Sequence, residues 1–313
     1  MIDINFNARL SVFTMKWIVL GVFLASVSYV HFRGKVRHRF YRQLFDHSGI
    51  VSPFNVFLYL FSKAPTTPYL SVNEFPELKL ITDRWQEIRE EALHVREQER
   101  IAAAQTNNDA GFNSFFKTGW KRFYLKWYDA HHPSASIYCP KTVALLQSIP
   151  SVKAAMFAEL PPGAHLRPHR DPYAGSLRFH LGLATPNNDQ CFIRVDGEDY
   201  SWRDGQAVMF DETYIHEAYN KTDETRVILF CDIERPMRYG WAQAVNRFLA
   251  NTIVTAASSP NEAGDQTGVI NRLFHYAWVV GQYRRRFKKW NKNVYQITRI
   301  LLITLVCYAI WKL

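Results

Sequence analysis

A histidine–aspartate pair and a more distant histidine are the residues of this chain best suited to chemistry. His169 and Asp171 are separated by one residue, and His216 follows further along the sequence. Two imidazoles and one carboxylate are the ligand set of a mononuclear non-haem Fe(II) site, the 2-His-1-carboxylate facial triad. Such a triad occupies one face of an octahedron and leaves the other positions for a co-substrate and O₂. The spacing therefore predicts a metal site with the ligands His169, Asp171 and His216.

The immediate surroundings of the pair support a metal site, although two alternatives stay open. Residues two apart in an extended segment point to the same side, so His169 and Asp171 would face together. Pro168 and Pro172 stiffen the backbone on either side and lower the ordering entropy that metal binding would cost. A set without a thiolate argues against a structural zinc site. A lone His-x-Asp pair is more often a surface or capping feature, and His165 is a rival ligand.

Arginine and histidine side chains on neighbouring strands predict a site for a dicarboxylate. Arg226 begins an apolar stretch, where a buried guanidinium is costly unless it is paired. Its fork geometry matches a carboxylate in a bidentate arrangement, such as the far carboxylate of 2-oxoglutarate. Arg178 and His180 are two apart on the strand after the metal pair and would face the same interior. The alternative is that these two residues only pair with Asp211 or Glu212.

The positive charge of the chain is concentrated beside its two apolar ends. The 313 residues carry a formal net charge of +10. The first basic cluster contains Arg33, Lys35, Arg37, His38, Arg39 and Arg42, and the second contains Arg284, Arg285, Arg286, Lys288, Lys289 and Lys292. Basic clusters next to hydrophobic segments are typical of proteins at an anionic membrane surface. We therefore expect an anionic membrane surface as a partner and no nucleic acid.

The apolar ends predict membrane attachment. The N-terminal stretch runs from about Leu10 to Phe32 with only Lys16 as an interruption, which is long enough to cross a hydrocarbon core of about 30 Å. A cleaved signal peptide would carry its charge before the apolar run, whereas here most of it follows, so we expect a retained helix. The stretch 300–310 is predicted either to span or to lie on the surface as an amphipathic helix. The positive-inside rule then places residues 33–295 in the cytoplasm.

Between these ends, a helical part precedes a part that is rich in short strands. An amphipathic pattern predicts one long helix over 83–104, and the apolar run 50–61, which is too short to span, is compatible with an interfacial or a buried element. The predicted strands are Ala154–Leu160, Leu177–Ala184, Gln190–Val195, Tyr200–Trp202, Ala207–Phe210, Ile215–Asn220 and Arg226–Ile233. Such a series of short strands separated by turn residues predicts a mainly β antiparallel barrel or jelly roll.

Five regions follow from these patterns. They are an N-terminal membrane helix (1–32), a basic juxtamembrane and helical region (33–150), the β core (151–240), a helical and loop extension (241–293), and a C-terminal membrane or interfacial helix (294–313). The metal and dicarboxylate residues all fall within the predicted β core.

Two long motifs carry a resemblance to a known family. They are His169-Arg-Asp-Pro-Tyr-Ala-Gly-Ser-Leu-Arg-Phe-His-Leu-Gly-Leu and Trp202-Arg-Asp-Gly-Gln-Ala-Val-Met-Phe-Asp-Glu-Thr-Tyr-Ile-His-Glu. The region from about Phe123 to Asp232 resembles the aspartyl/asparaginyl β-hydroxylase family of Fe(II)/2-oxoglutarate dioxygenases. The resemblance implies a double-stranded β-helix (cupin-like) core with flanking helices, and O₂ as the second co-substrate. By position, it implies iron on His169, Asp171 and His216, and 2-oxoglutarate on Arg226, with Arg178 and His180 assisting.

Within that family, the chain is most similar to the bacterial branch that hydroxylates lipid A. The similarity rests on Phe123-Tyr-Leu-Lys-Trp-Tyr, Cys139-Pro-Lys-Thr-Val, Ile149-Pro-Ser-Val-Lys-Ala-Ala-Met-Phe, Leu160-Pro-Pro-Gly and the apolar ends. It implies hydroxylation of C2 of a secondary acyl chain of lipid A, or of its Kdo-bearing precursor, at the cytoplasmic face of the inner membrane. The alternatives are a peptidyl aspartyl/asparaginyl β-hydroxylase and a cupin-like protein that binds a dicarboxylate without turnover. The peptide-hydroxylating branch has a glycine at the position of Asp171, which disfavours the first alternative.

Overall fold

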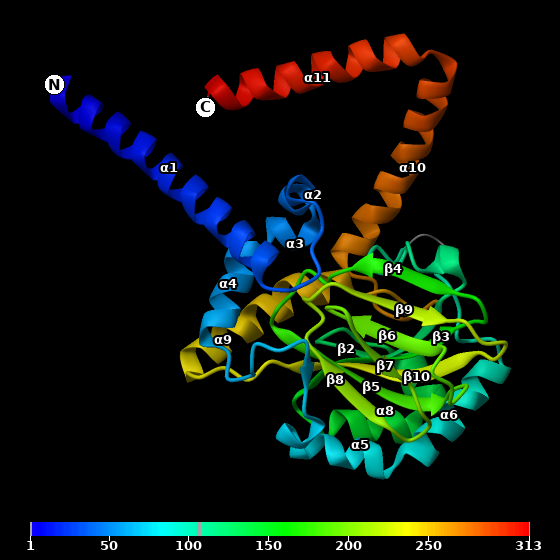
Figure 1. Ribbon diagram of the computed structural model, residues 1–313. Coiled ribbons are helices and arrows are strands. Elements are labelled where there is room, and N and C mark those ends of the chain that lie inside the picture. The colour runs from blue at the N-terminus through cyan, green and yellow to red at the C-terminus, as the bar shows by residue number, and fades with distance from the viewer. Residues whose placement is uncertain (1, 105–107, 313) are drawn as a thin grey trace.

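The computed structural model describes residues 2–104 and 108–312 and shows a β core from which helices at both ends of the chain extend (Figure 1). The strands are β1 Tyr69–Leu70, β2 Lys121–Trp127, β3 Val152–Leu160, β4 His165–His169, β5 Ser176–Ala184, β6 Cys191–Val195, β7 Glu198–Ser201, β8 Ala207–Phe210, β9 His216–Asn220 and β10 Arg226–Glu234. They form a six-stranded sheet in the order β1-β8-β5-β10-β3-β2 and a four-stranded sheet in the order β4-β9-β6-β7. All the paired strands are antiparallel.

The predicted mainly β, antiparallel core is confirmed. The larger sheet also contains two strands that lie outside the predicted core in the sequence. Each of the seven predicted strands is present, with its ends shifted by no more than two residues. β1 and β2, however, come from the region before residue 151, where only helices were predicted. β2 was missed because it lacks a polar face: Arg122, Phe123 and Tyr124 are all buried, so its sequence does not alternate.

Helices cover the outer face of the larger sheet and carry both ends of the chain (Figure 1). They are α1 Ile2–Phe32, α2 Phe40–Phe45, α3 His47–Ile50, α4 Ser52–Phe61, α5 Lys79–Asp83, α6 Trp85–Glu97, α7 Pro133–Tyr138, α8 Pro140–Gln147, α9 Gly240–Leu249, α10 Val269–Trp290 and α11 Lys292–Lys312. Short 3-10 helices lie at Val72–Glu74, Pro76–Leu78, Phe116–Thr118 and Thr255–Ala257, and a π-helical turn at Ala250–Val254. The buried residues of α6 and α8 share one hydrophobic core with the outward-facing residues of β5 and β10.

The helix predicted over 83–104 is shorter than expected. α6 ends at Glu97, and Glu99 adopts a left-handed backbone conformation with φ of 56°. Beyond that point Ala102 pairs with Arg122 of β2 through two backbone hydrogen bonds, of 3.1 and 3.2 Å. The amphipathic pattern continued past the helix because Ile101, which lies beyond its end, is buried in the same core.

α1 packs its last turns against α4. Within the described residues, Met15–Phe32 of α1 is the one segment that is long and apolar enough to cross a membrane. Val30, near the end of that segment, belongs to a small hydrophobic cluster with Leu58 and Tyr59 of α4. The run 50–61, which the sequence left open, therefore forms a helix with one buried side, while Phe54 and Leu60 are exposed on the other.

Arg33 joins the end of α1 to the β core. Its place in the first basic cluster had predicted a position at a membrane surface, and this prediction is wrong for Arg33. Its side chain is 5% exposed and binds Oδ2 of Asp211 at 2.6 Å and Oγ1 of Thr213 at 2.7 Å. Arg235, at the end of β10, binds the same Asp211 oxygen at 2.8 Å. Burial alone would raise the pKa of Asp211, but the two guanidinium groups outweigh it and hold that pKa well below its usual range.

We expect the variant Arg33→Met to lower the free energy of unfolding by about 1–3 kcal/mol, because it removes one of the two buried cations around Asp211 while Arg235 remains. Lys35→Met is the matched control, since the ion pair of Lys35 with Glu198 is exposed and should contribute less than about 0.5 kcal/mol. Urea unfolding of the detergent-solubilised protein measures both values. Equal losses in the two variants would contradict a structural role for Arg33.

Candidate metal and co-substrate site

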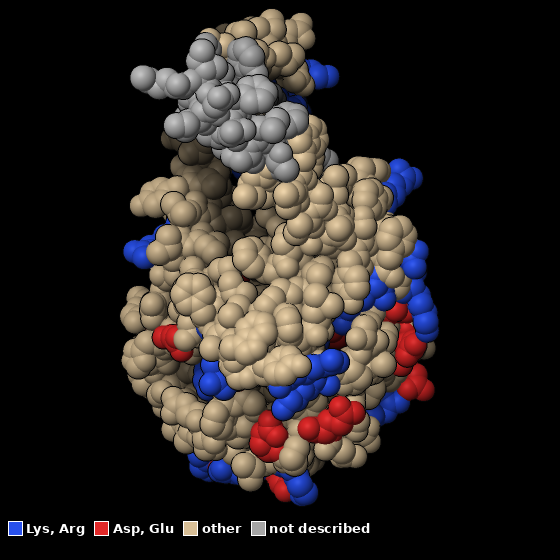
Figure 2. All heavy atoms as spheres, turned by 90° about the vertical axis from the view of Figure 1, so that its left-hand side faces the viewer, with Lys and Arg blue, Asp and Glu red and all other residues tan. Residues whose placement is uncertain are grey.

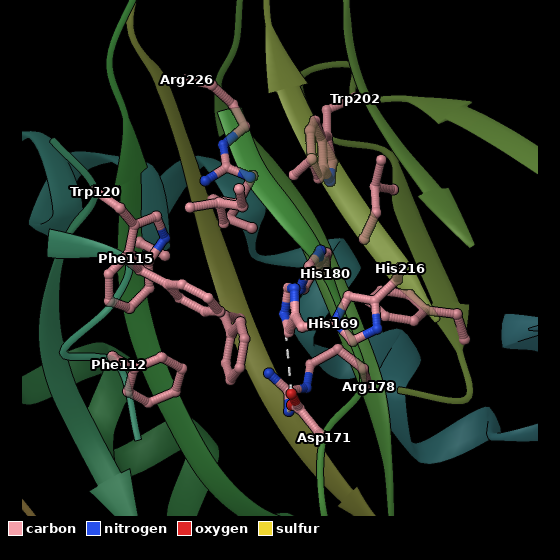
Figure 3. Close-up of a pocket in the computed structure, with 17 residues that line it drawn as sticks. Phe112, Phe115, Trp120, His169, Asp171, Arg178, His180, Trp202, His216 and Arg226 are labelled. Carbon is pink, nitrogen blue, oxygen red and sulfur yellow. Dashed lines mark hydrogen bonds and ion pairs between the residues drawn. The ribbon is translucent and has the colours of Figure 1, made fainter. Parts of the chain in front are cut away.

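A cavity lies between the inner faces of the two sheets (Figure 3). It is lined by Phe112, Phe115, Trp120, Ala158, Leu166, His169, Asp171, Arg178, His180, Ile193, Trp202, Phe210, His216, Ala218, Arg226, Ile228 and Phe230. The predicted metal ligands, Arg178, His180 and Arg226 are thus all brought together in one cavity. His169, Asp171 and His216 lie toward one end, and Arg226 lies at the other (Figure 3).

Strand pairing brings the two predicted histidine ligands together. His169 is the last residue of β4 and His216 the first of β9, and the two are directly opposite each other in the antiparallel pair. Their ring centroids are 4.2 Å apart. The backbone N–H of Asp171 donates to the carbonyl of Glu212 at 2.9 Å, which ties the two ligand-bearing loops. Ligand atoms of His169, Asp171 and His216 all lie within 4.8 Å of one another, close enough to share a metal ion.

Backbone carbonyls fix the orientation of both imidazoles. Nδ1 of His169 donates to the carbonyl of Arg167 at 2.7 Å, and Nδ1 of His216 donates to that of Tyr214 at 3.0 Å. In the neutral ring the remaining nitrogen, Nε2, then carries a lone pair, as a metal ligand requires. Burial lowers the pKa of both rings, that of His216 to about 3, so they are neutral at physiological pH.

Arg178 is bound to carboxylates and is not free to hold a co-substrate. Its guanidinium contacts Oδ2 of Asp171 at 2.6 Å, forms an ion pair with Asp232 at 3.1 Å, and also contacts Glu212. The alternative that Arg178 pairs with Glu212 is therefore correct, whereas Asp211 is bound elsewhere. Burial would raise the pKa of Asp171, but Arg178 and the neighbouring histidines together outweigh it and lower that pKa, while burial raises the pKa of Glu212 well above its usual value.

Arg226 is a buried cation without an ionic partner among the described residues. It is 2% exposed, and its guanidinium carbon lies 4.4 Å from the ring centroid of Trp202. Nε and one terminal nitrogen have no hydrogen-bond partner in the described structure. Burial lowers the pKa of Arg226 to about 10, so it stays charged at neutral pH. A buried guanidinium with unused donors fits a carboxylate ligand.

His180 faces the same cavity with both ring nitrogens unpaired in the part of the chain that the structure describes. Its ring packs edge-on against Phe210, with centroids 5.0 Å apart, and lies 5.3 Å from the Phe230 ring. Burial lowers the pKa of His180 well below 6.5, so the neutral ring offers one N–H donor and one acceptor. The alternative of pairing with Asp211 or Glu212 therefore does not hold for His180.

An aromatic wall that the sequence did not predict closes one side of the cavity. Phe115 lies edge-on to His169 at 4.7 Å between ring centroids, and Phe112 stacks on Trp120 at 5.0 Å. These residues precede the predicted β core and reach the site only through tertiary packing. Asp232, also missed, could have been found from strand alternation, because it shares one side of β10 with Arg226.

The rival ligand His165 lies outside the cavity. Its ring stacks on Tyr219 with centroids 4.0 Å apart, and its Nε2 lies 3.2 Å from a carboxylate oxygen of Glu217. β4 is irregular between Leu166 and His169, where its register with β9 shifts. The four-residue spacing of the two histidines therefore does not place them side by side.

Helices next to α1 hold the loop that contains Asp171. Arg170, which is 3% exposed, donates to the carbonyl of Val30 in the last turn of α1 at 2.9 Å. Asn55 of α4 donates to the carbonyl of Pro172 at 2.8 Å and accepts from the backbone N–H of Ala174 at 3.0 Å. The segment around the predicted carboxylate ligand is therefore anchored to the apolar N-terminal part of the chain.

Comparisons with known proteins identify a family and several relatives. The Aspartyl/Asparaginyl beta-hydroxylase family model matches residues 82–236. The chain is 44% identical over 138 residues to the ornithine lipid ester-linked acyl 2-hydroxylase of Rhizobium tropici, covering 44% of this chain and 49% of that protein. It is 28% identical over 164 residues to human aspartyl/asparaginyl beta-hydroxylase, covering 51% of this chain and 21% of that one.

A Pseudomonas putida prolyl-4-hydroxylase structure is similar with 20% identity and a TM-score of 0.34, covering 50% of this chain and 88% of that chain. The chain spans about half the length of the rhizobial relative and about a fifth of the human one. The residues that the family model matches include both histidines and the aspartate of the cavity. Residues 82–236 of this chain belong to the aspartyl/asparaginyl β-hydroxylase family.

Proposed function

We propose that this protein is a membrane-bound Fe(II)- and 2-oxoglutarate-dependent dioxygenase that hydroxylates C2 of an ester-linked acyl chain in a membrane lipid. One observation carries the proposal: a His-Asp-His group and an unpaired, buried Arg226 lie in the same aromatic cavity. Family membership and the identity to an acyl 2-hydroxylase support it. The two sheets around the cavity are compatible with the double-stranded β-helix that the resemblance implies.

The residues present fit the implied metal and co-substrate. Two neutral imidazoles and an ionised carboxylate form a donor set that suits Fe(II), and the unused donors of Arg226 suit the far carboxylate of 2-oxoglutarate. Bound iron and 2-oxoglutarate would supply the oxidising chemistry, in which O₂ gives one atom to succinate, released with CO₂, and the other to the substrate C–H bond.

The chain's own residues would bind, orient and shield the reactants. Arg178 keeps Asp171 ionised and fixes one of its oxygens, so that the other faces the histidines. Arg226 would fix the depth of the co-substrate, and the N–H of His180 would donate to an oxygen of a bound ligand. Phe112 and Phe115 would exclude water and contact an aliphatic chain, because they give that side of the cavity an apolar surface.

A membrane lipid is the substrate class that best matches the chain. The rhizobial relative acts on an ester-linked acyl chain of ornithine lipid by its name, and α1 offers a way to hold the site at a bilayer. Secondary acyl chains of lipid A are also ester-linked. Lipid A or its Kdo-bearing precursor, which the sequence predicted, therefore remains the first candidate substrate, and ornithine lipid is the second. The β core would face the cytoplasm at the inner membrane, beside anionic headgroups. Hydroxylation of a peptide, by contrast, does not by itself require a helix such as α1.

We expect Asp171→Ala or His216→Ala to weaken Co(II) binding by more than about 100-fold, because each removes one of three ligands in the proposed site. Co(II) is a suitable probe because its visible absorption bands report bound metal without turnover. His165→Ala is the matched control, since that ring lies on the outside of the sheet, and its affinity should stay within about twofold of the wild type.

The pH dependence of the same titration provides a further check. Burial brings the pKa of His216 to about 3, so this ring stays neutral as the pH falls through 6.5, and burial also lowers the pKa of His169, which is therefore protonated less readily than an ordinary histidine. Affinity should therefore fall by less than about tenfold between pH 7.5 and 5.5, whereas two ordinary histidines would lose about 100-fold. A loss of affinity in His165→Ala as large as in Asp171→Ala would contradict the ligand assignment.

We expect Arg226→Met to weaken binding of 2-oxoglutarate by at least about 30-fold, because a buried charge-assisted hydrogen bond to the far carboxylate would be lost. Binding is followed as the change that 2-oxoglutarate causes in the spectrum of the Co(II) protein. Two controls apply. 2-Oxobutyrate, which lacks the far carboxylate, should bind both proteins equally. Arg96→Met should bind 2-oxoglutarate normally, because Arg96 is paired with Glu159 and does not line the cavity. Unchanged 2-oxoglutarate binding in Arg226→Met would assign the carboxylate to another residue.

The proposed reaction itself is tested by mass spectrometry of lipids from bacterial hosts that lack 2-hydroxylated acyl chains, one with lipid A and one with ornithine lipid. Wild-type protein should add one oxygen to an acyl chain, at C2 by fragmentation, and Asp171→Ala should add none. The host in which the gain occurs identifies the lipid.

The contrary result is that the protein adds no oxygen to the lipids of either host, while the purified protein still couples O₂ uptake to succinate release in the presence of a peptide. That combination of results would favour the peptidyl hydroxylase instead. Binding of 2-oxoglutarate without succinate release on any of these substrates would favour the non-catalytic alternative.

A further inference from the structure

α9 presents an apolar face to the outside of the molecule. Trp241, Val245 and Phe248 recur at helical spacing and are 54%, 37% and 67% exposed. A neighbouring side of the same helix is buried in the core, through Ala242 and Leu249 among others. An amphipathic helix normally turns its apolar side inward, so a second apolar side of this kind indicates a partner outside the described chain.

An aromatic cluster joins this face to α4. Trp241 lies 4.8 Å from Phe61 and 5.8 Å from Phe57 between ring centroids, and Tyr239 stacks parallel to Trp241 at 6.2 Å. α4 continues the surface with exposed side chains at Phe54 and Leu60, which are 51% and 60% exposed. Residues 52–61 include no charged side chain. Figure 2, which views this side of the molecule, shows a wide area with few Lys, Arg, Asp or Glu side chains.

α1 indicates what covers this surface. α4 packs against the last turns of the segment Met15–Phe32, and Tyr29 of α1 lies 6.1 Å from Tyr59 of α4 between ring centroids. If α1 crosses a bilayer, its last turns lie at the level of the headgroups, and α4 is held at the same level. α1, α4 and α9 lie on one side of the β core (Figure 1). Exposed tryptophan, tyrosine and phenylalanine are the residues of membrane interfaces.

We propose that α4 and α9 lie in the interfacial layer of the membrane that α1 crosses, with the lipid bilayer covering Phe54, Trp241 and Phe248. The proposal rests on the membrane attachment of α1 that is part of the proposed function. It places the cavity directly behind the bilayer surface, because Asn55 of α4 holds the loop that follows Asp171. An acyl chain would then pass from the bilayer to the site without crossing water.

The test measures how deeply labels at chosen positions lie in lipid. The full chain, with Cys307→Ser, carries a single environment-sensitive fluorophore at Phe248→Cys or Phe54→Cys in phosphatidylethanolamine/phosphatidylglycerol nanodiscs. The remaining cysteines, Cys139, Cys191 and Cys231, are buried and should not react. Quenching by nitroxide-labelled lipid is compared with quenching by aqueous iodide.

Two control positions make the outcomes distinct. Leu80→Cys on α5 is 51% exposed on another side of the core and should be quenched by iodide alone, whereas Val19→Cys on α1 is 61% exposed and should be quenched by the lipid nitroxide. We expect lipid quenching at positions 248 and 54 to exceed that at position 80 by at least about threefold, as burial of an interfacial helix by several ångströms requires.

Lipid quenching at position 19 but not at 248 and 54 would overturn the interfacial placement and leave the membrane attachment intact. Absence of lipid quenching at position 19 would overturn the attachment itself, and the interfacial placement with it. Protection of positions 248 and 54 from both quenchers would mean that a protein surface, such as a second copy of the chain, covers them, which also overturns the proposal.

Discussion

The pairing of buried charges is the constraint on which the site depends, because an unpaired ion in the interior of a protein is costly. The guanidinium of Arg178 is paired with the carboxyl groups of three acidic residues, and the carboxylate of Asp211 is paired with two guanidinium groups. Arg226 lies in the same core and has no ionic partner within the described residues, although it is even more deeply buried than Arg178. The contact with the Trp202 ring offsets part of this cost, and a carboxylate ligand would bring the missing negative charge. This end of the cavity is therefore suited to an anionic ligand.

The same need to pair buried charges connects the end of α1 to the candidate site. Arg33 supplies one of the two cations that Asp211 needs, and Arg170 uses a backbone carbonyl at the end of α1 as its acceptor. Arg170 lies between two of the proposed ligands in sequence, and Asp211 begins the loop that leads to His216. Both ligand-bearing loops are thus fixed to the segment that would emerge from a membrane. An anchor joined by a flexible linker would leave the orientation of the site open, whereas α1, if it crosses a membrane, would determine which side of the core faces the bilayer.

The sequence predicts those parts of the structure that depend on local patterns. Strand boundaries came from alternation and turn residues, and the proximity of His169 and Asp171 from their spacing in an extended segment. Residues whose roles depend on distant partners were predicted less well. Arg33 looked like a surface cation because nothing in its neighbourhood reveals Asp211, and Arg178 looked available because its carboxylate partners come from three separate segments. Side-chain alternation along β10 is the one local signal that would have placed Asp232 on the same, inward face of the strand as Arg226.

The two oxygens of Asp171 have different surroundings, and Arg178 accounts for the difference. One of its oxygens, Oδ2, accepts from Arg178, and the other, Oδ1, lies 4.0 Å from Nε2 of His169. With Oδ2 engaged, the carboxylate has a single oxygen to offer a metal, and three single-atom donors from two histidines and one aspartate occupy three positions. An octahedral ion would keep the other three for ligands, two for a chelating 2-oxo acid and one for O₂. Arg178 would thus limit what Asp171 can donate, while Arg226, at the far end of the same cavity, would provide the charge for the proposed co-substrate.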